Sequence, residues 1–374
     1  MCRNIIYMVW CAVALLVSCD GAGCGMCVSG RRECNRPTTS SEARVRLLFA
    51  GDAMCHSPQI ETARQTDGSL DFRGSFADVK PYFDRADIAV VNLETTISPD
   101  NRYSGYPTFS SPVEYAEALA WAGMDIAMLA NNHCCDRGAR GVRSTVATLD
   151  RLGVAHTGAF ADAADHERNR VLRVERNGVK FAFVNYTYGT NGMPVPSDCT
   201  VNLMDTLIMA EDLRLAAEDA DCVVACVHWG EEYRSRPSRN QHRVADFLRR
   251  HGADIVVGSH PHVVQPAKAD SNGVIIYSLG NFVSNMSKKK TDGGAMVKLE
   301  LVKSFGITRL MQCGYSLVWT SRPILSGKMN FEVYPASFVD KQLENEELVR
   351  MKWFLDDSRK LFDKHNIGIK EHFF

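Results

Sequence analysis

Two histidines separated by one proline offer the clearest metal-binding chemistry in this sequence. His260 and His262 follow the apolar run Ile255–Val257 and a Gly-Ser pair. Residues i and i+2 of an extended segment share a face, so both imidazoles would point the same way, and Pro261 would stiffen their spacing. Neutral imidazole is the commonest metal ligand in proteins. A polar loop that happens to contain histidines is the alternative, and the rest of the chain is needed to choose between the two.

Polar residues also follow five other apolar runs. The sequence reads Gly-Asp after the first run, Asn-Leu-Glu after the second and Asn-Asn-His after the third; His-Trp-Gly-Glu-Glu-Tyr and Leu-Gly-Asn-Phe follow two later runs. Ligands of open α/β sheets bind outside the carboxyl ends of the strands, so these polar tips should converge. Taken singly, Asp52 could cap a helix, Glu94 could be a solvated loop acid and Asn132 could occupy a turn. The candidate metal ligands are Asp52, Glu94, Asn132, His228, His260 and His262.

These candidate ligands combine carboxylate and amide oxygens with imidazole nitrogens. Such a set suits divalent Zn, Mn, Fe or Mg and needs no thiolate. Two metal ions about 3.5–4 Å apart would share one carboxylate and would lower the pKa of a shared water, which produces a nucleophile at neutral pH. Glu94 is the candidate bridge. The sequence therefore predicts a centre for two divalent metal ions.

Alternating strand and helix patterns must position these side chains. This alternation predicts an α/β fold with largely parallel strands. The expected strands are Val45–Ala50, Ile88–Val91, Ile126–Ala130, Val179–Asn185, Cys222–Val227, Ile255–Val257 and Val274–Tyr277. The expected helices between them are Phe76–Arg85, Pro112–Ala122, Gly141–Leu152, Asp205–Ala220 and Ser238–His251.

The pattern changes after Gly294 to consecutive strands. Ala295–Val302, Ile307–Gln312 and Asn330–Tyr334 would form a second, partly antiparallel sheet, and a helix over Glu344–Lys364 would close the fold. The domain boundaries that follow are residues 44–337 for the α/β domain and residues 338–374 for a helical extension packed on it. A body of this length can bury a sizeable core.

The first residues predict export. Arg3 is a positive charge ahead of Ile5–Val17, an apolar stretch that is short for a transmembrane helix. The segment from Leu16 to Cys19 reads as a lipobox in which Cys19 becomes lipid-modified; a plain secretory signal and an uncleaved anchor are the alternatives. Residues 1–18 would then be a signal peptide, and residues 19–43, rich in Gly, Ser, Thr and Arg, a flexible tether. We therefore expect an exported lipoprotein anchored to a membrane of the bacterial cell envelope.

Composition narrows the function classes. The chain is 45% hydrophobic and 23% charged with a formal net charge of -1, and no basic-aromatic alternation points to nucleic acid. Its 13 cysteines are an odd number and most fall singly in apolar runs, which does not indicate a disulfide framework. Most of them are expected to be small buried hydrophobic residues.

Taken together, the motifs resemble the bacterial capsule-synthesis family of the CapA poly-γ-glutamate type, within the calcineurin-like metallophosphatase superfamily. The resemblance covers roughly Val45–Val283, with every motif in the right order, and it implies a four-layer α-β-β-α sandwich. The motifs that carry it are GDAM at Gly51–Met54, NLE at Asn92–Glu94, ANNHCCDRG at Ala130–Gly138, HWGEEY at His228–Tyr233, GSHPHVVQP at Gly258–Pro266 and SLGNF at Ser278–Phe282.

The resemblance also implies roles for single residues. Asp52 falls on the first metal-binding aspartate of the superfamily, Glu94 on its bridging acid and Asn132 on its asparagine. His133 matches the histidine that helps to polarise the leaving group. The later metal histidines fall on His228, His260 and His262.

The sequence departs from the superfamily pattern at two places. The usual histidine two residues beyond the first aspartate is replaced by Met54, a poor ligand for a hard divalent ion, so His56 could replace it or one metal site could be incomplete. The bridge is a glutamate, Glu94, and not the usual aspartate. Metal binding is therefore a firmer expectation than ordinary phosphoesterase activity.

Basic and aromatic residues after His228 suggest an anionic ligand. Arginine guanidinium groups beside a metal cleft suit carboxylate or phosphate groups, although a solvated cluster at a helix end is the alternative. The expected substrate-binding residues are Tyr233, Arg234, Arg236 and Asn281.

Two classes of function remain open. The first is an enzyme in which metal-activated water attacks a phosphoester, or an amide of a γ-glutamyl or other envelope polymer, with His133 as the acid. The second is a membrane-tethered binding or export factor that holds an anionic capsule polymer and uses the metals structurally. Its partners would be poly-γ-glutamate or a phosphorylated envelope substrate, the membrane and other capsule-synthesis proteins, with no nucleic acid. Family likeness alone does not establish the chemistry.

Overall fold

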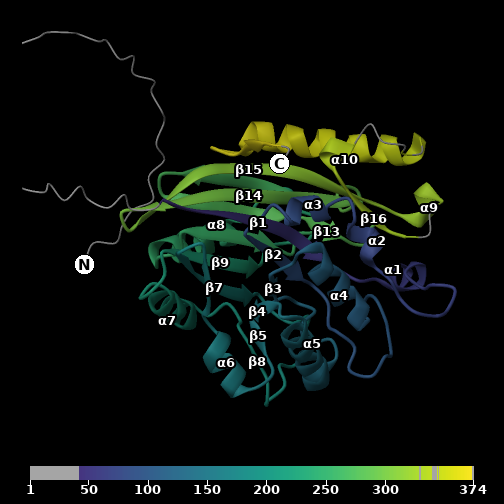
Figure 1. Cartoon of the computed structure of the whole chain (residues 1–374), viewed down its shortest axis with the longest axis horizontal. Coiled ribbons are helices and arrows are strands. Elements are labelled where there is room, and N and C mark those ends of the chain that lie inside the picture. Colours follow the sequence, from purple (N-terminus) through teal and green to yellow (C-terminus); the bar gives the residue numbers. More distant parts are fainter. Residues whose placement is uncertain (1–41, 328–329, 339–342, 344, 373–374) are drawn as a thin grey trace, which may run out of the picture.

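Two β-sheets packed face to face form the centre of the molecule (Figure 1). The structure is a computed structural model that describes residues 42–327, 330–338, 343 and 345–372. The predicted signal peptide, Cys19 and nearly all of the predicted tether lie outside the described residues. Within the described residues, none of the helices is both long enough and apolar enough to span a lipid bilayer.

The first sheet combines the N-terminal strands with the C-terminal ones. Its main path runs in the order β16-β15-β14-β1-β2-β3-β4; β13 pairs with β1, and β17 pairs with β15. β1 to β4 and β13 are mutually parallel where they pair, whereas β14, β15 and β16 are antiparallel. The bounds are β1 Ala43–Ala53, β2 Ile88–Leu93, β3 Ile126–Met128, β4 Ala155–Thr157, β13 Asn281–Val283, β14 Gly293–Ser304, β15 Ile307–Ser321, β16 Glu332–Pro335 and β17 Lys370–Glu371.

The second sheet is built from the middle of the chain, in the order β11-β12-β10-β9-β7-β6. β12, β10, β9 and β7 are parallel, and the outermost strands β11 and β6 are antiparallel to their neighbours. Its strands are β6 Leu172–Arg176, β7 Val179–Thr187, β9 Cys222–His228, β10 Ile255–Ser259, β11 Val264–Asp270 and β12 Gly273–Leu279; β5 Ala159–Phe160 and β8 Thr200–Val201 form a separate pair.

Helices pack on the outer face of each sheet. Apolar residues of α1 to α5 pack on the first sheet, and those of α7 and α8 pack on the second. The bounds are α1 Ser57–Thr62, α2 Arg73–Phe76, α3 Lys80–Phe83, α4 Val113–Ala122, α5 Gly138–Leu152, α6 Ala163–Asn169, α7 Thr206–Ala216, α8 Arg239–Arg250, α9 Pro323–Ser326, the 3-10 helix η1 Ala336–Phe338 and α10 Asn345–His365.

Alternation along β1 shows how the layers form. Val45, Leu47 and Phe49 join the core between the two sheets, whereas Leu48 and Ala50 join the core under α1 to α5. Successive side chains of a strand point to opposite faces, so one buried strand supplies both cores. A third core lies between the second sheet and its helices. Three apolar layers between four layers of elements confirm the predicted α/β, four-layer α-β-β-α sandwich.

Helix α10 runs along β15 and also contacts β11 of the second sheet (Figure 1). Its Met351, Phe354 and Phe362 side chains are buried in the core between the sheets. The helix therefore bridges both sheets at one side of the sandwich.

Two expectations about elements were wrong. The strands after Gly294 do not form a sheet of their own, because β14 pairs with β1 from Ala43 to Phe49 and so extends the first sheet. The single helix expected over Phe76–Arg85 is two short helices, α2 and α3. Pro81 lies in the first turn of α3, where its missing N–H costs nothing, so it favours a new helix start over a continuous helix.

Candidate metal centre

Ligand-type side chains from both sheets meet at the carboxyl ends of the parallel strands. Asp52 and Glu94 lie at the ends of β1 and β2, His228 ends β9, and His260 and His262 follow β10. With Asn132, all six are between 0% and 4% exposed. Buried carboxylates and imidazoles need close partners, because burying an unpaired charge is costly. The structure thus brings together the six side chains named as the main candidate ligands.

Glu94 lies at the centre of this cluster. Its Oε1 atom is 3.6 Å from His228 Nε2 and 3.7 Å from His262 Nε2. Two sets of side chains could each hold a metal ion, with the ligand atoms of each set within 4.8 Å of one another, and both include Glu94. The first set is Glu94, His260 and His262; the second is Asp52, Glu94 and His228.

Three buried atoms of the centre lack hydrogen-bond partners among the described residues. They are Glu94 Oε1, His260 Nδ1 and Oδ1 of the neighbouring Asn92. Buried polar atoms are normally satisfied, so an orphaned carboxylate oxygen beside an orphaned ring nitrogen is what a missing cation would explain. Oxygen and imidazole donors also match the preferences of divalent ions. The residues present therefore fit the predicted metal ions.

Neighbouring strands fix the Asp52 carboxylate. Asp52 pairs with Asn92 of β2 on one side and with Asn281 of β13 on the other. The Asn92 amide donates to Asp52 Oδ1 at 2.8 Å, and the backbone N–H of His260 lies 3.3 Å from Oδ2. His262 Nδ1 is 3.2 Å from the same Oδ2 and 3.0 Å from Asn281 Oδ1. These contacts hold the carboxylate and the ring in one orientation.

His228 is oriented from both of its ring nitrogens. Its Nε2 lies 2.7 Å from Asn132 Oδ1, and its Nδ1 lies 3.0 Å from the hydroxyl of Ser259, its cross-strand neighbour in β10. The Asn132 amide nitrogen donates to Asn191 Oδ1 at 3.2 Å. Asn132 therefore lies beside the cluster with its carbonyl oxygen toward it, and it does not merely occupy a turn.

The backbone that carries the two histidines is not extended, contrary to the sequence prediction. His260 has φ 96° and His262 has φ 57°, in the left-handed region that side chains other than glycine rarely adopt. Such a conformation costs roughly 1–3 kcal/mol per residue and persists where surrounding contacts over-determine it. β10 ends at Ser259 and β11 begins only at Val264, so the histidines lie on the reversing turn between them.

Burial dominates the electrostatics of the cluster. It raises the pKa of Glu94 well above its usual value, and the nearby Asp52 charge raises it further. Burial also lowers the pKa of His260 to about 3 and lowers that of His228. For His262, burial lowers the pKa, but the hydrogen bond and charge of Asp52 outweigh it and raise the pKa overall. The contact with Asp52 therefore favours the protonated form of His262.

His133, the predicted catalytic acid, lies beside the cluster and is 3% exposed. Its Nδ1 is 2.8 Å from Asp136 Oδ2, which also accepts a hydrogen bond from the Phe109 backbone N–H at 2.6 Å. The Phe109 ring packs edge-on against His133 with centroids 4.6 Å apart. Asp136 contacts the ring at Nδ1, so Nε2 is the ring nitrogen left for proton exchange.

One known protein family matches most of this chain. The family model described as "Bacterial capsule synthesis protein PGA_cap" matches residues 46–286, well over half of the chain. The chain belongs to this capsule synthesis family. The resemblance to the capsule-synthesis family that was inferred from the motifs is thereby confirmed.

Two relatives of this capsule synthesis protein are named for capsule or PGA biosynthesis. The chain is 32% identical over 271 residues to "Capsule biosynthesis protein CapA" of Bacillus anthracis, covering 69% of this chain and 64% of the relative. It is 27% identical over 281 residues to "PGA biosynthesis protein CapA" of Bacillus subtilis, covering 74% and 73%. The match thus spans less than two thirds of the length of the Bacillus anthracis relative.

One solved structure to which this chain is similar is the calcineurin-like phosphoesterase YfkN from Bacillus subtilis. It superposes with a TM-score of 0.44 at 11% identity, covering 86% of this chain and 99% of that chain.

Met54 occupies the position at which the resemblance to the superfamily led us to expect a histidine. Its side chain is buried, and its carbonyl accepts hydrogen bonds from Gln59 at 2.9 Å and from the Tyr115 hydroxyl at 2.9 Å. His56 belongs to neither of the two ligand sets. Its Nδ1 lies 3.2 Å from Gln59 Oε1 and 3.3 Å from the Asn285 N–H. Burial lowers the pKa of His56 to about 4, which favours its neutral form.

The predicted substrate-binding residues take different places. Tyr233 is near the centre, with its ring 6.3 Å from that of His262. Arg234 is exposed and lies 3.4 Å from Glu231, and Arg236 contacts His365 of α10. Asn281 is fully buried behind His262, and its amide nitrogen donates to Thr291 at 2.8 Å. Asn281 therefore orients a histidine and does not face a substrate.

Sequence reasoning missed three residues of the centre: Asn92, Tyr188 and Ser259. Asn92 lies two residues before Glu94, and that spacing in a strand was a usable signal for a shared face. Tyr188 is 44% exposed, and its ring lies 4.6 Å from that of His260 and 6.3 Å from that of His228. No spacing in the sequence connects Tyr188 with these histidines, because it follows the end of β7.

Proposed function

We propose that this chain is a capsule-biosynthesis protein of the CapA type that binds two divalent metal ions and hydrolyses a bond in an anionic envelope polymer or a phosphoester. The observation that carries the proposal is the orphaned, buried Glu94 Oε1 atom, which belongs to both ligand sets. The names of the two CapA relatives support the place of the reaction in capsule or PGA biosynthesis.

The residues would divide the chemistry between holding metal and moving a proton. Glu94 with His260 and His262 would hold one ion, and Asp52 with Glu94 and His228 would hold the other, with Asn132 beside His228. Bound metal ions supply Lewis acidity and a water of lowered pKa. Asp136 fixes His133 through Nδ1, so the proton that His133 delivers to a leaving group sits on Nε2.

Metal content and a hydrolase screen test the proposal. Purified protein should contain a transition metal, and Asp52→Ala or the double variant His260→Ala/His262→Ala should lose both metal and turnover. His251→Ala is the matched control, because His251 is an exposed histidine at the end of α8. The double variant keeping its metal would refute the assigned ligands.

The screen should include phosphoesters and γ-glutamyl amides. Turnover of either class by the metal-loaded protein supports the proposal. Tight binding of an anionic polymer with metal present and no turnover would instead favour a tethered binding or export factor whose metals are structural.

We also propose that the protein is an exported lipoprotein attached to a membrane of the cell envelope through Cys19. The support is the lipobox-like segment Leu16–Cys19. Cys19→Ala should move the protein from the membrane fraction to the soluble fraction. Unchanged membrane retention of this variant would contradict the assignment.

A further inference from the structure

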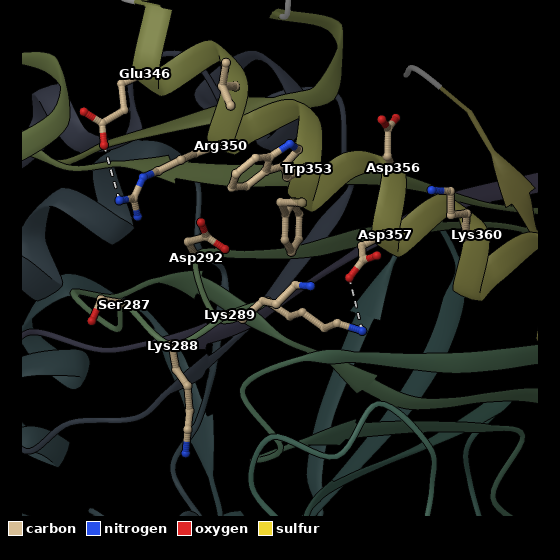
Figure 2. A pocket seen from close by; sticks show the side chains of 13 residues that line it. Ser287, Lys288, Lys289, Asp292, Glu346, Arg350, Trp353, Asp356, Asp357 and Lys360 are labelled. Carbon is tan, nitrogen blue, oxygen red and sulfur yellow. Dashed lines mark hydrogen bonds and ion pairs between the residues drawn. The ribbon is translucent and has the colours of Figure 1, made fainter.

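A groove of about 720 Å³ lies between the turn Ser287–Asp292 and α10 (Figure 2). Trp353 of α10 lines it and is 69% exposed. All of its lining residues come after residue 286, beyond the part of the chain that matches the family model. The groove is therefore a feature that membership of the family does not explain.

The charges that line the groove are unequally neutralised. Lys290 pairs with Asp357 at 3.2 Å, and Arg350 pairs with Glu346 at 3.3 Å, within α10. Lys289 and Lys360 have no ion-pair partner among the described residues. Figure 2 shows Lys289 extending below the face of α10 that carries Trp353 and Asp357. The groove thus offers cations that are free to meet an anionic ligand.

The acidic groups that line the groove do not neutralise the positive charges of Lys289 and Lys360. Asp292 is largely buried, where burial raises the pKa of its carboxyl group, and Trp319 Nε1 donates to it at 3.3 Å. Asp357 and Glu346 are already paired with cations. Asp356 is the remaining lining carboxylate, against the two lysines Lys289 and Lys360. The unpaired charge is therefore positive.

On the side that faces away from α10, the turn Ser287–Asp292 approaches the candidate metal centre. Lys288 points away from α10 (Figure 2), and its ammonium group lies 3.5 Å from the centroid of the Tyr233 ring. Tyr233 in turn lies beside His262, with ring centroids 6.3 Å apart. A cation over an aromatic face is a favourable arrangement that leaves the ammonium group able to bind an anion. Lys288 and Tyr233 thus connect the groove with the metal centre.

Buried contacts hold the lysine-bearing turn in place. The Asn281 amide, which orients His262 through Oδ1, donates to Thr291 O at 2.8 Å. Thr291 donates from its hydroxyl to Lys288 O at 2.7 Å. The buried Arg322 donates to Met286 O at 3.4 Å. A turn that is anchored in this way presents its lysines without a large ordering cost.

We propose that this groove binds an extended polycarboxylate chain and that the Lys288–Tyr233 contact leads that chain toward the metal centre. The assignment rests on the proposed function for its substrate, and it adds the place where the polymer binds outside the metal centre and the path that it takes to that centre. Lysines bind carboxylates as point charges along a chain, and Trp353 offers an apolar surface for the methylene groups between them.

The shape and charge of the groove favour this ligand over two other anionic surfaces. A concave groove does not match a flat membrane. Carboxylates in the same lining, such as Asp356, oppose densely charged phosphate chains more strongly than a chain with single, spaced charges. Polyphosphate and anionic vesicles are therefore the competitors to include in the test.

The experiment measures binding of fluorescently labelled poly-γ-glutamate to the purified full-length protein by anisotropy. The double variant Lys289→Glu/Lys360→Glu should weaken binding roughly tenfold or more, because two attractive contacts become repulsive. Lys352→Glu is the matched control: it reverses an exposed charge on the same helix outside the groove and should leave binding unchanged. Trp353→Ala should weaken binding without changing its dependence on salt.

Several results would overturn the proposal. These are equal binding by the double variant and the wild type, equal weakening by Lys352→Glu, and tighter binding of polyphosphate or of phosphatidylglycerol vesicles than of poly-γ-glutamate. Metal analysis of the same preparations separates this inference from the proposed function. If the protein holds no metal but its polymer affinity depends on the groove lysines, the groove is supported and the hydrolase is refuted. If the protein holds metal and turns over substrate but its polymer affinity does not depend on these lysines, the hydrolase is supported and the groove is refuted.

Discussion

Glu94 and His260 differ in the protonation state that burial favours in the metal-free protein. Burial favours the protonated form of Glu94 and the neutral form of His260. A divalent cation needs an ionised carboxylate and a neutral imidazole as ligands. His260 is therefore already in the form that binds metal, whereas Glu94 must lose its proton first. Metal affinity should therefore rise with pH as Glu94 gives up its proton.

The depressed pKa of His260 predicts how the stability of the chelated protein depends on pH. The folded protein keeps His260 neutral until about pH 3, whereas the unfolded chain binds this proton near pH 6.5. The contribution of His260 to the free energy of unfolding is therefore present above about pH 6.5 and is lost as the pH falls toward 3. Glu94 has the opposite sign, because its raised pKa adds stability at low pH that is lost as the pH rises.

Urea unfolding of chelated wild type and His260→Gln at about pH 7 and about pH 5 isolates this effect. Wild type should lose more stability than the variant on acidification. Glu94 acts equally on both proteins, so it cancels in the comparison. Parallel losses in the two proteins would show that His260 is not held neutral by burial.

At the scale of elements, a close approach of two strands sets the position of Asp52. The Asp52 backbone N–H donates to Gly280 O at 2.9 Å. A Cβ atom at Gly51 would lie 2.0 Å from that same oxygen, which belongs to the backbone and cannot swing away as a side chain could. Only glycine lets β1 approach the end of β12 this closely.

Gly51→Ala should therefore displace β1 from Gly280 and move the Asp52 carboxylate. We expect a loss of metal affinity of roughly 10- to 100-fold, the range seen when a ligand is displaced through its supporting contacts. Isothermal titration with Mn²⁺ or Zn²⁺ measures the change. Gly189→Ala is the control, because a methyl group there would meet nothing within 4 Å. Equal affinities of the two variants would contradict this account of the strand contact.

The sequence predicted strands well where a local pattern of apolar residues was enough to specify them. Val45 to Ala50 and Cys222 to Val227 are short apolar runs without Pro or Gly, and each is a strand in the structure. β11 was missed because Val264–Asp270 contains Pro266 and polar residues, a composition that suits an outermost strand. The sheet that β14 joins could not be read from local patterns, because strand partners are set by packing over the whole domain.

The candidate site was also predictable in part, where a general rule of strand arrangement applied. Convergence of Asp52, Glu94 and His228 could be predicted because parallel strands end on one side of their sheet. The left-handed turn at His260 and His262 could not, because only a few per cent of non-glycine residues adopt positive φ and no local pattern marks these two histidines. Tyr188 was equally hidden, since the tilted contact of its ring with His260 depends on how the loop after β7 folds back.

At the scale of the whole molecule, the ligands come from both sheets. Asp52 and Glu94 belong to the first sheet and the three histidines to the second. Metal bound between them would tie the two sheets together, and a ligand that binds only the folded state stabilises it. At a free metal concentration of about 100 times Kd, this effect amounts to roughly 2.7 kcal/mol.

Adding Mn²⁺ or Zn²⁺ to chelated protein should therefore raise the thermal unfolding temperature, and Glu94→Gln should remove most of the increase. Differential scanning calorimetry provides the measurement. Glu61→Gln, at an exposed position on α1, should keep the full increase. A rise of the same size in both variants would place the stabilising ion somewhere other than at Glu94.

The pairing of β1 with β14 has a consequence for the order of events during synthesis. Leu47 is the partner of Leu299, which lies far along the chain, so one side of β1 stays open until most of the polypeptide has left the ribosome. Contacts between such distant segments form slowly. A newly made chain would thus remain without its finished cation-binding pocket for most of its synthesis, and the pocket would be among the last parts of the molecule to take shape.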